Sequence, residues 1–123
     1  MKKLLIIMFA LLVGTTALDA QSIAYVKQKN GYYQLYNDNG RVVANISTDN
    51  KTTLVGYSER LVVLKKDGYY IIYKCTGVKV GTVDADLVGT IKRVLKDGFI
   101  SERKGYLYKW NEDGSKYTII GSK

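Results

Sequence analysis

Hydrophobic and polar residues alternate along the chain after residue 22, in short runs that end at glycine-containing turns. Alternation with a period of two is typical of β-strands, because successive side chains point to opposite faces of a sheet. The same region shows no helical periodicity and contains no proline that would interrupt a strand. The pattern therefore predicts an all-β fold built from antiparallel hairpins.

The glycines place the predicted strands in a repeating order. Two series of glycines recur with a spacing of 37 residues, namely Gly31, Gly68 and Gly105, and Gly40, Gly77 and Gly114. Strands are predicted before the first glycine (residues 23–28, 61–65 and 99–102), after it (32–36, 69–73 and 106–110) and after the second glycine (42–46, 78–83 and 116–120). A shorter fourth strand is predicted between the repeats, at residues 53–57 and 90–94.

A tandem repeat of 37 residues indicates one supersecondary structure used three times. The first unit lacks a fourth strand, because the corresponding positions fall within residues 1–20. Open sheet edges favour pairing with other chains, so repeated β-units usually close or stack. We therefore expect three antiparallel β-meander units in a closed or curled pseudo-threefold arrangement, either β-trefoil-like or propeller-like.

The first turn of each unit has the sequence of a tight hairpin. Asn30-Gly31 and Asp67-Gly68 favour a two-residue type I′ turn, in which both central residues have positive φ. The third copy, Lys104-Gly105, keeps only the glycine. Each second turn is a polar four-residue stretch that ends in glycine, which is typical of a type I turn closed by a left-handed residue.

The two-residue turns also predict which residues lie opposite one another. Residues 25, 62 and 99 are expected to face residues 36, 73 and 110 on the aromatic side of each hairpin, that is Tyr25, Val62 and Phe99 opposite Tyr36, Tyr73 and Trp110. The other side is aliphatic and is predicted to form the deep core, through Val26, Leu35, Val63, Ile72 and Ile100. The aromatic side is expected to become exposed toward Tyr32, Tyr69 and Tyr106.

Tyrosine rings interleaved with cations are the strongest candidate for a binding site in this tyrosine-rich chain. Sugar rings pack on aromatic faces, and cations beside the rings attract anionic groups. The candidate ligand-binding residues are Tyr32, Tyr69, Tyr106, Tyr108, Lys29, Lys66 and Arg103. The alternative is that these tyrosines only pack the fold, because tyrosine favours strands and partly buried positions.

The segment from Lys29 to Val43, with counterparts that begin at Lys66 and Arg103, resembles the WG-type bacterial repeat. In that repeat a short strand, a glycine turn, an aromatic-glycine doublet and a second glycine turn recur. At the position of the Trp-Gly doublet this chain has Tyr33-Gln34, Tyr70-Ile71 and Leu107-Tyr108. The chain also looks like other small exported bacterial β-repeat proteins, and neither resemblance implies a reaction.

The first twenty residues predict a secretory signal peptide. Lys2 and Lys3 precede an apolar run over residues 4–13, and small residues then lead to Ala20. Cleavage is expected after Ala20 or, alternatively, after Ala17. An uncleaved membrane anchor is the other interpretation, but the run is shorter than the roughly 20 residues of a membrane span. We expect a signal peptide over residues 1–20, a single β-repeat domain over residues 21–123, no transmembrane anchor after cleavage, and export to a bacterial periplasm or beyond the cell.

Charge and composition restrict the chemistry. The formal net charge is +8, so the chain is basic, and it contains no histidine. Without histidine, neither a Ser-His-Asp nor a Cys-His arrangement can form. Cys75 is the only cysteine. We interpret it as an incidental turn residue, the alternatives being an intermolecular disulfide or a reactive thiol. No cofactor and no metal site are predicted.

These observations lead to three hypotheses about function. The first is a non-enzymatic exported binding module of unknown ligand, either a glycan or anionic polymer or a protein partner, with no specific nucleic acid expected. The second is a structural or accessory envelope protein that acts through protein–protein contacts. The third is a hydrolase that uses the carboxylates of Asp84 and Asp86, for which a simple turn cluster is the alternative interpretation.

Overall fold

The computed structural model describes residues 22–122, so the predicted signal peptide over residues 1–20 lies outside the described residues. Within that range the chain forms eleven strands and one short helix. The first sheet contains β1 (Tyr25–Lys29), β2 (Tyr32–Tyr36) and β3 (Val42–Ser47). The second contains β4 (Thr53–Tyr57), β5 (Leu61–Lys66), β6 (Tyr69–Lys74) and β7 (Lys79–Asp84). The helix α2 (Ala85–Val88) leads to the third sheet, which contains β8 (Thr90–Leu95), β9 (Gly98–Arg103), β10 (Tyr106–Asn111) and β11 (Tyr117–Ser122).

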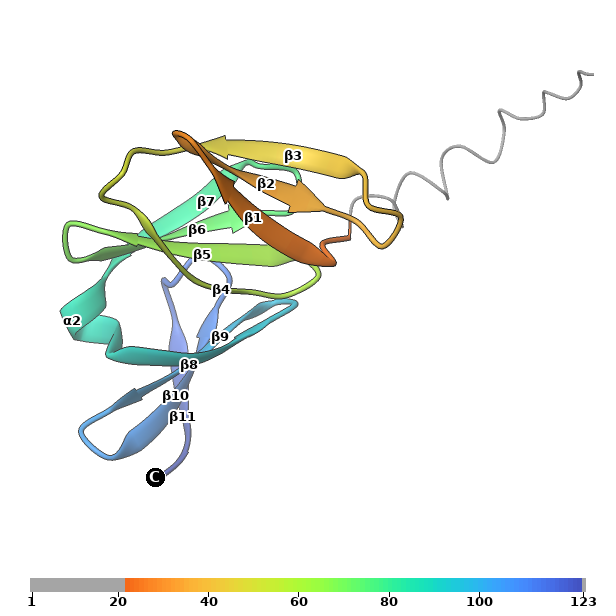
Figure 1. Cartoon of the computed structure of the whole chain (residues 1–123). Coiled ribbons are helices and arrows are strands. Elements are labelled where there is room, and N and C mark those ends of the chain that lie inside the picture. Colours follow the sequence, from red (N-terminus) through yellow and green to blue (C-terminus); the bar gives the residue numbers. More distant parts are fainter. Residues whose placement is uncertain (1–21, 123) are drawn as a thin grey trace, which may run out of the picture.

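Each sheet is an antiparallel meander whose strands follow in chain order. The three sheets stack one after another, from β1–β3 through β4–β7 to β8–β11 (Figure 1). The prediction of an all-β fold of antiparallel hairpins is thereby confirmed, and the first sheet has three strands where the other two have four. The ladders stay within each sheet, so the sheets are joined by side-chain packing and turn contacts.

The predicted register of the first hairpins is also confirmed. Tyr25 lies opposite Tyr36, Val62 opposite Tyr73 and Phe99 opposite Trp110. The hairpin turns differ in one respect from the prediction. Asp67 and Lys104 have φ of 53° and 54°, whereas Asn30 is not among the residues with positive φ. The type I′ prediction therefore fails at Asn30, and Lys104 adopts the left-handed conformation although it is neither Asn nor Asp.

Two clusters of buried side chains form the core, one on each face of the second sheet. The four residues Leu61–Leu64 of β5 are at most 1% exposed, although their side chains alternate between the two faces. Val62 and Leu64 pack with Tyr33 and Leu35 of the first sheet. The other cluster joins Leu61 and Val63 of β5 to Phe99 and Trp110 of the third sheet. The second sheet is therefore covered on both sides.

The prediction of a single deep aliphatic face is wrong at the third sheet. Ile100 lies on the side of β9 opposite Phe99 and is only half-buried, because no further sheet covers that side among the described residues. Cys75 does lie in a turn, as expected, but it is 7% exposed and packs into the first core cluster with Leu35 and Leu64. Its thiol is free.

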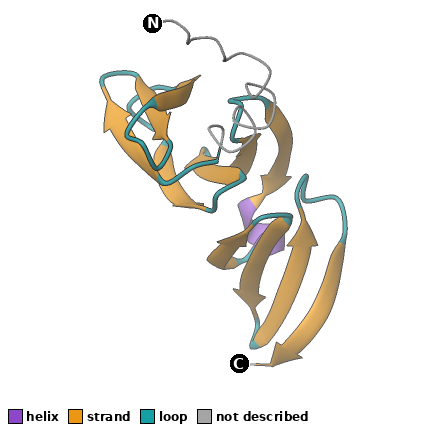
Figure 2. Cartoon of the chain, turned by 90° about the vertical axis from the view of Figure 1, so that its right-hand side faces the viewer, coloured by secondary structure: helices purple, strands orange, loops and turns teal. Residues whose placement is uncertain are grey.

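The single turn of helix α2 was not expected from the sequence. Asp84 caps its N-terminus by accepting a hydrogen bond of 2.8 Å from the backbone N–H of Asp86. Figure 2 shows this turn where the chain passes from the second to the third sheet. Asp84 and Asp86 thus take part in local capping at the start of the connection.

Two buried tyrosines, one in each of the first two sheets, hydrogen-bond to the backbone of the connection that follows their sheet. The Tyr33 hydroxyl donates to the backbone carbonyl of Thr52 (3.1 Å), and the Tyr70 hydroxyl donates to that of Gly89 (2.7 Å). Burial raises the pKa of Tyr70, which favours the protonated phenol that donates this bond. Leu107 stands at the corresponding position of the third sheet and has no hydroxyl to donate.

Candidate functional site

Three pairs of a cation and a tyrosine lie at corresponding hairpin turns of the three sheets. Lys29 is paired with Tyr32, Lys66 with Tyr69 and Arg103 with Tyr106, each on neighbouring antiparallel strands. The turns between β1 and β2, between β5 and β6 and between β9 and β10 lie on one side of the stack, at the left in Figure 1. We call these six residues the hairpin-tip row.

The local sequence explains why each pair forms. The second residue of each of these turns is a glycine with φ between 83° and 85°, a region that residues with a β-carbon rarely adopt. A two-residue turn there brings the residue before it directly opposite the residue after it. Opposed side chains in an antiparallel pair have β-carbons about 5 Å apart, so the cation and the tyrosine of each pair extend from neighbouring positions on one face of the hairpin.

The tyrosines of the row differ in exposure. Tyr69 and Tyr106 are 47% and 51% exposed, which agrees with the sequence prediction, whereas Tyr32 is half-buried. Tyr108 does not join them. Its ring packs edge-on against Tyr117 (5.3 Å between ring centroids) and lies 6.5 Å from the centroid of Trp110, at the junction between the second and third sheets.

The three cations have different partners. The Lys66 ammonium lies 2.6 Å from the Asp49 carboxylate, and this hydrogen bond is the main reason why the pKa of Asp49 falls to about 2. The same contact raises the pKa of Lys66. The Arg103 guanidinium lies 5.8 Å from the centroid of the Tyr108 ring. Lys29 is exposed at the end of β1.

A second surface of aromatic and cationic residues lies on the outer face of the first sheet. Its residues are not among the ligand-binding residues predicted from the sequence. The Tyr25 and Tyr36 rings stack with their centroids 4.7 Å apart and their planes 9° apart. The Lys27 ammonium lies 5.7 Å and 5.5 Å from these two centroids. Alternation predicted that these three residues share a face, but it does not indicate that, among residues 22–122, no other sheet covers this face.

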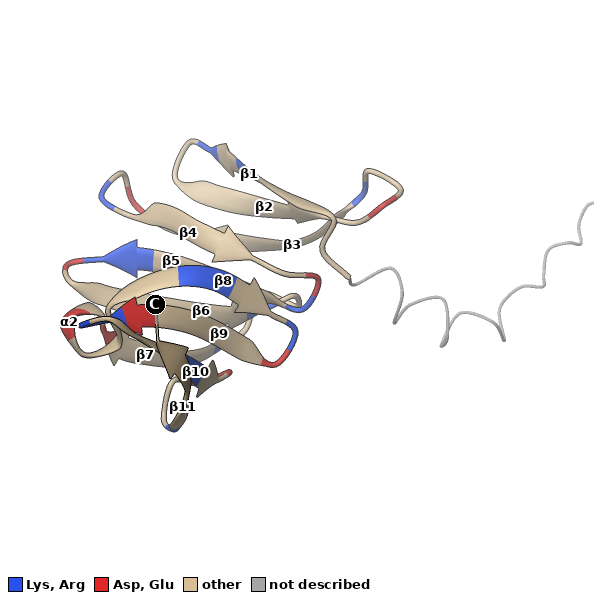
Figure 3. Ribbon diagram, turned by 90° about the horizontal axis from the view of Figure 1, so that it is seen from below, with Lys and Arg blue, Asp and Glu red and all other residues tan. Residues whose placement is uncertain are grey.

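The charges are concentrated at strand ends and turns. Figure 3 shows Lys and Arg, and Asp and Glu, mainly in the connections and at the ends of strands, with blue segments along β5 and β8. Five ion pairs join these charges within the described range, among them Lys92–Glu102 at 3.3 Å and Lys96–Glu59 at 3.4 Å. Most of these pairs are solvent-exposed, so each contributes little to stability.

The described residues contain no group of three or more His, Cys, Asp or Glu side chains placed to hold a metal ion. In the same range, no helix is long and apolar enough to cross a membrane. The arrangement at the hairpin-tip row offers flat rings, hydroxyl groups and positive charges, which suit recognition of a ligand by stacking and charge.

Comparisons with protein-family models, with curated proteins and with solved structures give no significant match to this chain.

Proposed function

We propose that this chain is a non-enzymatic binding module for an anionic, sugar-containing polymer, which it binds along the hairpin-tip row. The observation that carries the proposal is the identical register of the three pairs, in which a cation faces a tyrosine at the same turn of each sheet. Stacked sheets lie about 10 Å apart. The row therefore offers three tyrosine rings along roughly 20 Å, which matches an extended polymer better than a compact ligand. Among residues 22–122 the cations Lys29 and Arg103 form no ion pair, whereas the charge of Lys66 is balanced by Asp49.

The chemistry of each pair supports the same ligand class. A tyrosine ring packs on the apolar face of a sugar, and its hydroxyl bonds to a sugar hydroxyl. The adjacent ammonium or guanidinium attracts a carboxylate or sulfate on the polymer. The predicted signal peptide would bring the module to the periplasm or the cell exterior, where such polymers occur as envelope components. No chemical step on the ligand forms part of this function.

A binding experiment on residues 21–123 tests the proposal. Neutral and acidic glycans are titrated by isothermal calorimetry at low and high salt, with the unaltered chain and with Tyr69→Ala and Tyr106→Ala. Loss of one stacked ring is expected to weaken acidic glycan binding about three- to tenfold, in line with the 0.5–1.5 kcal/mol typical of an aromatic contact. Tyr57→Ala, at a tyrosine of β4 that is 39% exposed and outside the row, is the matched control.

Two outcomes would overturn this function. The first is unchanged affinity when Tyr32, Tyr69 and Tyr106 are all replaced by alanine. The second is binding that disappears at high salt and responds equally to Lys66→Gln and to Lys116→Gln, a change at an exposed turn outside the row. The latter result would indicate only a general attraction to a basic surface.

One observation favours the second hypothesis, a structural or accessory envelope protein that acts through protein contacts. The edge strand β11 exposes Tyr117 (55%), Ile119 (56%) and Ile120 (48%) and carries no charged residue between Tyr117 and Ser122. An uncharged, hydrophobic sheet edge is a template for pairing with a strand of another protein. Capture of an envelope partner that Ile119→Lys abolishes would support this role, and a chain that captures no partner would contradict it.

We further propose that the three sheets are blades of a curled, propeller-like arrangement related to the WG-type repeats. Two features support this over a trefoil: each unit has its own sheet, and the edge strands β4 and β8, which are the first strands of the second and third sheets, lie beside each other. A β-carbon on Gly56 of β4 would come within 3.1 Å of the Val94 side chain of β8. Whether the curl closes about a threefold axis is tested by small-angle X-ray scattering of residues 21–123.

A further inference from the structure

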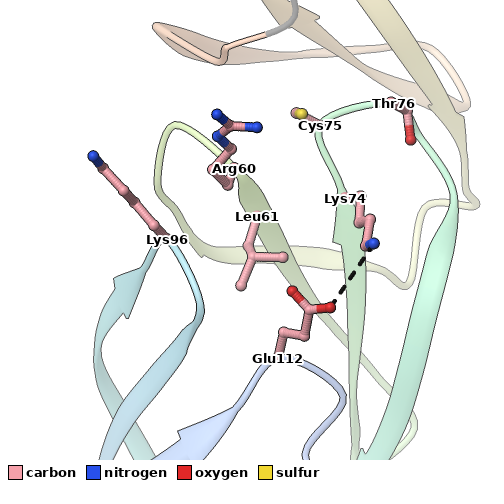
Figure 4. Close-up of a pocket in the computed structure, with 7 residues that line it drawn as sticks. All are labelled: Arg60, Leu61, Lys74, Cys75, Thr76, Lys96 and Glu112. Carbon is pink, nitrogen blue, oxygen red and sulfur yellow. Dashed lines mark ion pairs between the residues drawn. The ribbon is translucent and has the colours of Figure 1, made fainter. Parts of the chain in front are cut away.

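A recess of about 370 Å³ lies between the second and third sheets, on the side of the stack opposite the hairpin-tip row. The side chains of Arg60, Lys74 and Lys96 line it, together with Glu112 and Cys75 (Figure 4). Arg60 lies in the turn before β5 and Lys96 in the turn between β8 and β9, and Lys74 is the last residue of β6. We call this feature the cationic recess.

Hydrogen bonds between the turns hold the frame of the recess. The backbone N–H of Cys75 donates to the carbonyl of Arg60 (2.9 Å), which ties the turn after β6 to the turn before β5. The Ser58 hydroxyl donates to the carbonyl of Leu95 (2.8 Å) and accepts from the backbone N–H of Arg60 (3.2 Å). Three segments far apart in the sequence are thereby linked at the recess, so Arg60 and Lys96 extend from a connected backbone.

An apolar side chain backs the recess. Leu61 is 1% exposed and belongs to the core cluster between the second and third sheets, whereas Cys75 packs in the cluster between the first and second sheets. The Lys74 and Lys96 side chains are 49% and 70% exposed, so an anionic group in the recess would have Leu61 on one side and water on the other. Partial removal of water strengthens charge-assisted hydrogen bonds.

Positive charge exceeds negative charge at the recess. Lys74 lies 3.8 Å from Glu112, and Lys96 lies 3.4 Å from Glu59, so two ammonium groups are partly balanced. Among residues 22–122, no carboxylate lies within ion-pair distance of the Arg60 guanidinium. Arg60 therefore adds a positive charge, and its planar group can donate two parallel hydrogen bonds to one oxyanion.

The fold does not require these cations. The positions 37 residues earlier, at the junction of the first and second sheets, correspond to Arg60, Lys74 and Lys96 and carry Ile23, Asn37 and Glu59. At that junction Ile23 is 5% exposed and Asn37 is 3% exposed, so the same positions are filled by core and turn residues. The concentration of charge is thus particular to the second junction.

We infer that the cationic recess binds a tetrahedral oxyanion, the phosphate or sulfate group of a ligand. Arg60 binds two oxygens side by side, and the ammonium groups of Lys74 and Lys96 approach the remaining oxygens from the other segments. The site is separate from the hairpin-tip row and does not depend on the function proposed for that row.

Titration followed by NMR tests the inference on residues 21–123. Inorganic phosphate, sulfate and acetate are added at constant ionic strength, with sodium chloride as the balancing salt. Phosphate or sulfate is expected to shift the backbone amide signals of Arg60, Thr76 and Lys96 along a saturating curve. Arg60→Gln is expected to weaken this binding about tenfold, as loss of a hydrogen bond to a charged group does.

Lys51→Gln is the matched control, because it removes one positive charge from an exposed position outside the recess. It should leave the affinity within twofold of the unaltered chain, and the amide spectrum of each variant confirms that it is folded. Saturation by only one of phosphate and sulfate identifies the group. The inference is overturned if acetate binds as tightly as both, if Arg60→Gln binds normally, or if Lys51→Gln causes an equal loss.

Discussion

The covered faces and the open faces of the stacked sheets differ at their central positions. Leu35 and Ile72 lie 37 residues apart on β2 and β6, and both are 0% exposed between two sheets. The next position in the series is Lys109 on β10, whose side chain is 39% exposed and pairs with Asp97 at 3.3 Å. This lysine lies on the open face of the third sheet.

The open face of the first sheet shows the same difference. Leu64 and Ser101 are 0% exposed at junctions between sheets, whereas the corresponding residue of β1 is Lys27, which lies over two tyrosine rings. One lysine thus stands at the centre of each open face. Terminal units of stacked repeats need a polar outer face to stay soluble. The comparison indicates that single central residues distinguish a face that stacks from a face that meets solvent.

The largest effect is expected when lysine, the residue at the centre of each open face, is placed at the centre of a covered face. Ile72→Lys places an ammonium group where the side chain is 0% exposed and packed between two sheets. A buried charge without a partner is among the most destabilising changes in a protein. We expect a loss of about 4 kcal/mol or more in the free energy of unfolding, measured by urea denaturation.

Lys109→Ile is the reverse change and serves as its control. It removes an exposed ion pair, which contributes little to stability. The free energy of unfolding should therefore stay within about 0.5 kcal/mol of the unaltered chain. Equal losses in the two variants would show that the covered and open faces do not differ as described.

The two covered junctions also differ in how closely the sheets approach each other, as the space around Gly81 and Ala44 shows. A β-carbon on Gly81 of β7 would collide with the backbone of Asp113 and come 2.9 Å from its carbonyl carbon. The corresponding residue of β3 is Ala44, where the facing Gly77 leaves room. Gly81→Ala is therefore expected to destabilise the chain by about 2 kcal/mol, as overpacking typically does.

Thermal unfolding of Gly81→Ala and Gly121→Ala tests this difference between junctions. A β-carbon on Gly121 would meet no atom within 4 Å, so that variant should unfold like the unaltered chain. Tolerance of Gly81→Ala would mean that the second junction has as much room as the first.

The strands and their register followed from the sequence, because both depend on neighbours along the chain. Alternation and the 37-residue glycine spacing located the hairpins and placed Phe99 opposite Trp110. Alternation assigns a residue to a face, but it does not reveal whether another sheet covers that face. For this reason Ile100 was expected in the deep core.

The two candidate sites also differ in whether neighbours along the chain are enough to predict them. The cation–tyrosine pairs could be predicted, since each lies across a single hairpin turn. The cationic recess could not, because Arg60, Lys74 and Lys96 come from separate segments that meet only when two sheets stack. The exclusion of Tyr108 from the hairpin-tip row has the same origin, since the adjacent sheet covers its side of β10.

A smaller loss of stability is expected when a hydrogen bond between a tyrosine of a covered face and the following connection is removed. Tyr70→Phe removes the donor to the Gly89 carbonyl while it keeps the buried ring. A lost hydrogen bond that leaves a buried acceptor unpaired costs about 1–2 kcal/mol. We expect this loss in urea denaturation, whereas Tyr69→Phe, at a ring that is 47% exposed, should have no measurable effect. A Tyr70→Phe chain as stable as the unaltered one would remove this role for the hydroxyl.

The smallest effect concerns the ion pair between the connection after the first sheet and the second sheet. The Lys66 hydrogen bond is the main reason why the pKa of Asp49 falls from 3.8 to about 2 in the folded chain. Because the folded pKa lies below the ordinary value, the stabilisation is present above pH 3.8. It is lost as the pH falls from about 4 to about 2. Carboxyl NMR titration of the folded chain should show the Asp49 midpoint near pH 2.

Lys66→Met should raise the pKa of Asp49 toward 3.8 without reaching it, because the Lys51 N–H and the Thr52 hydroxyl still donate to the carboxylate. Lys51→Met is the matched control, since Lys51 acts through its backbone and its side chain takes no part. Across the other junction Arg103 lies over Tyr108, so no ion pair there corresponds to Lys66–Asp49 among the described residues. An Asp49 midpoint that Lys66→Met leaves near pH 2 would show that the turn alone lowers this pKa.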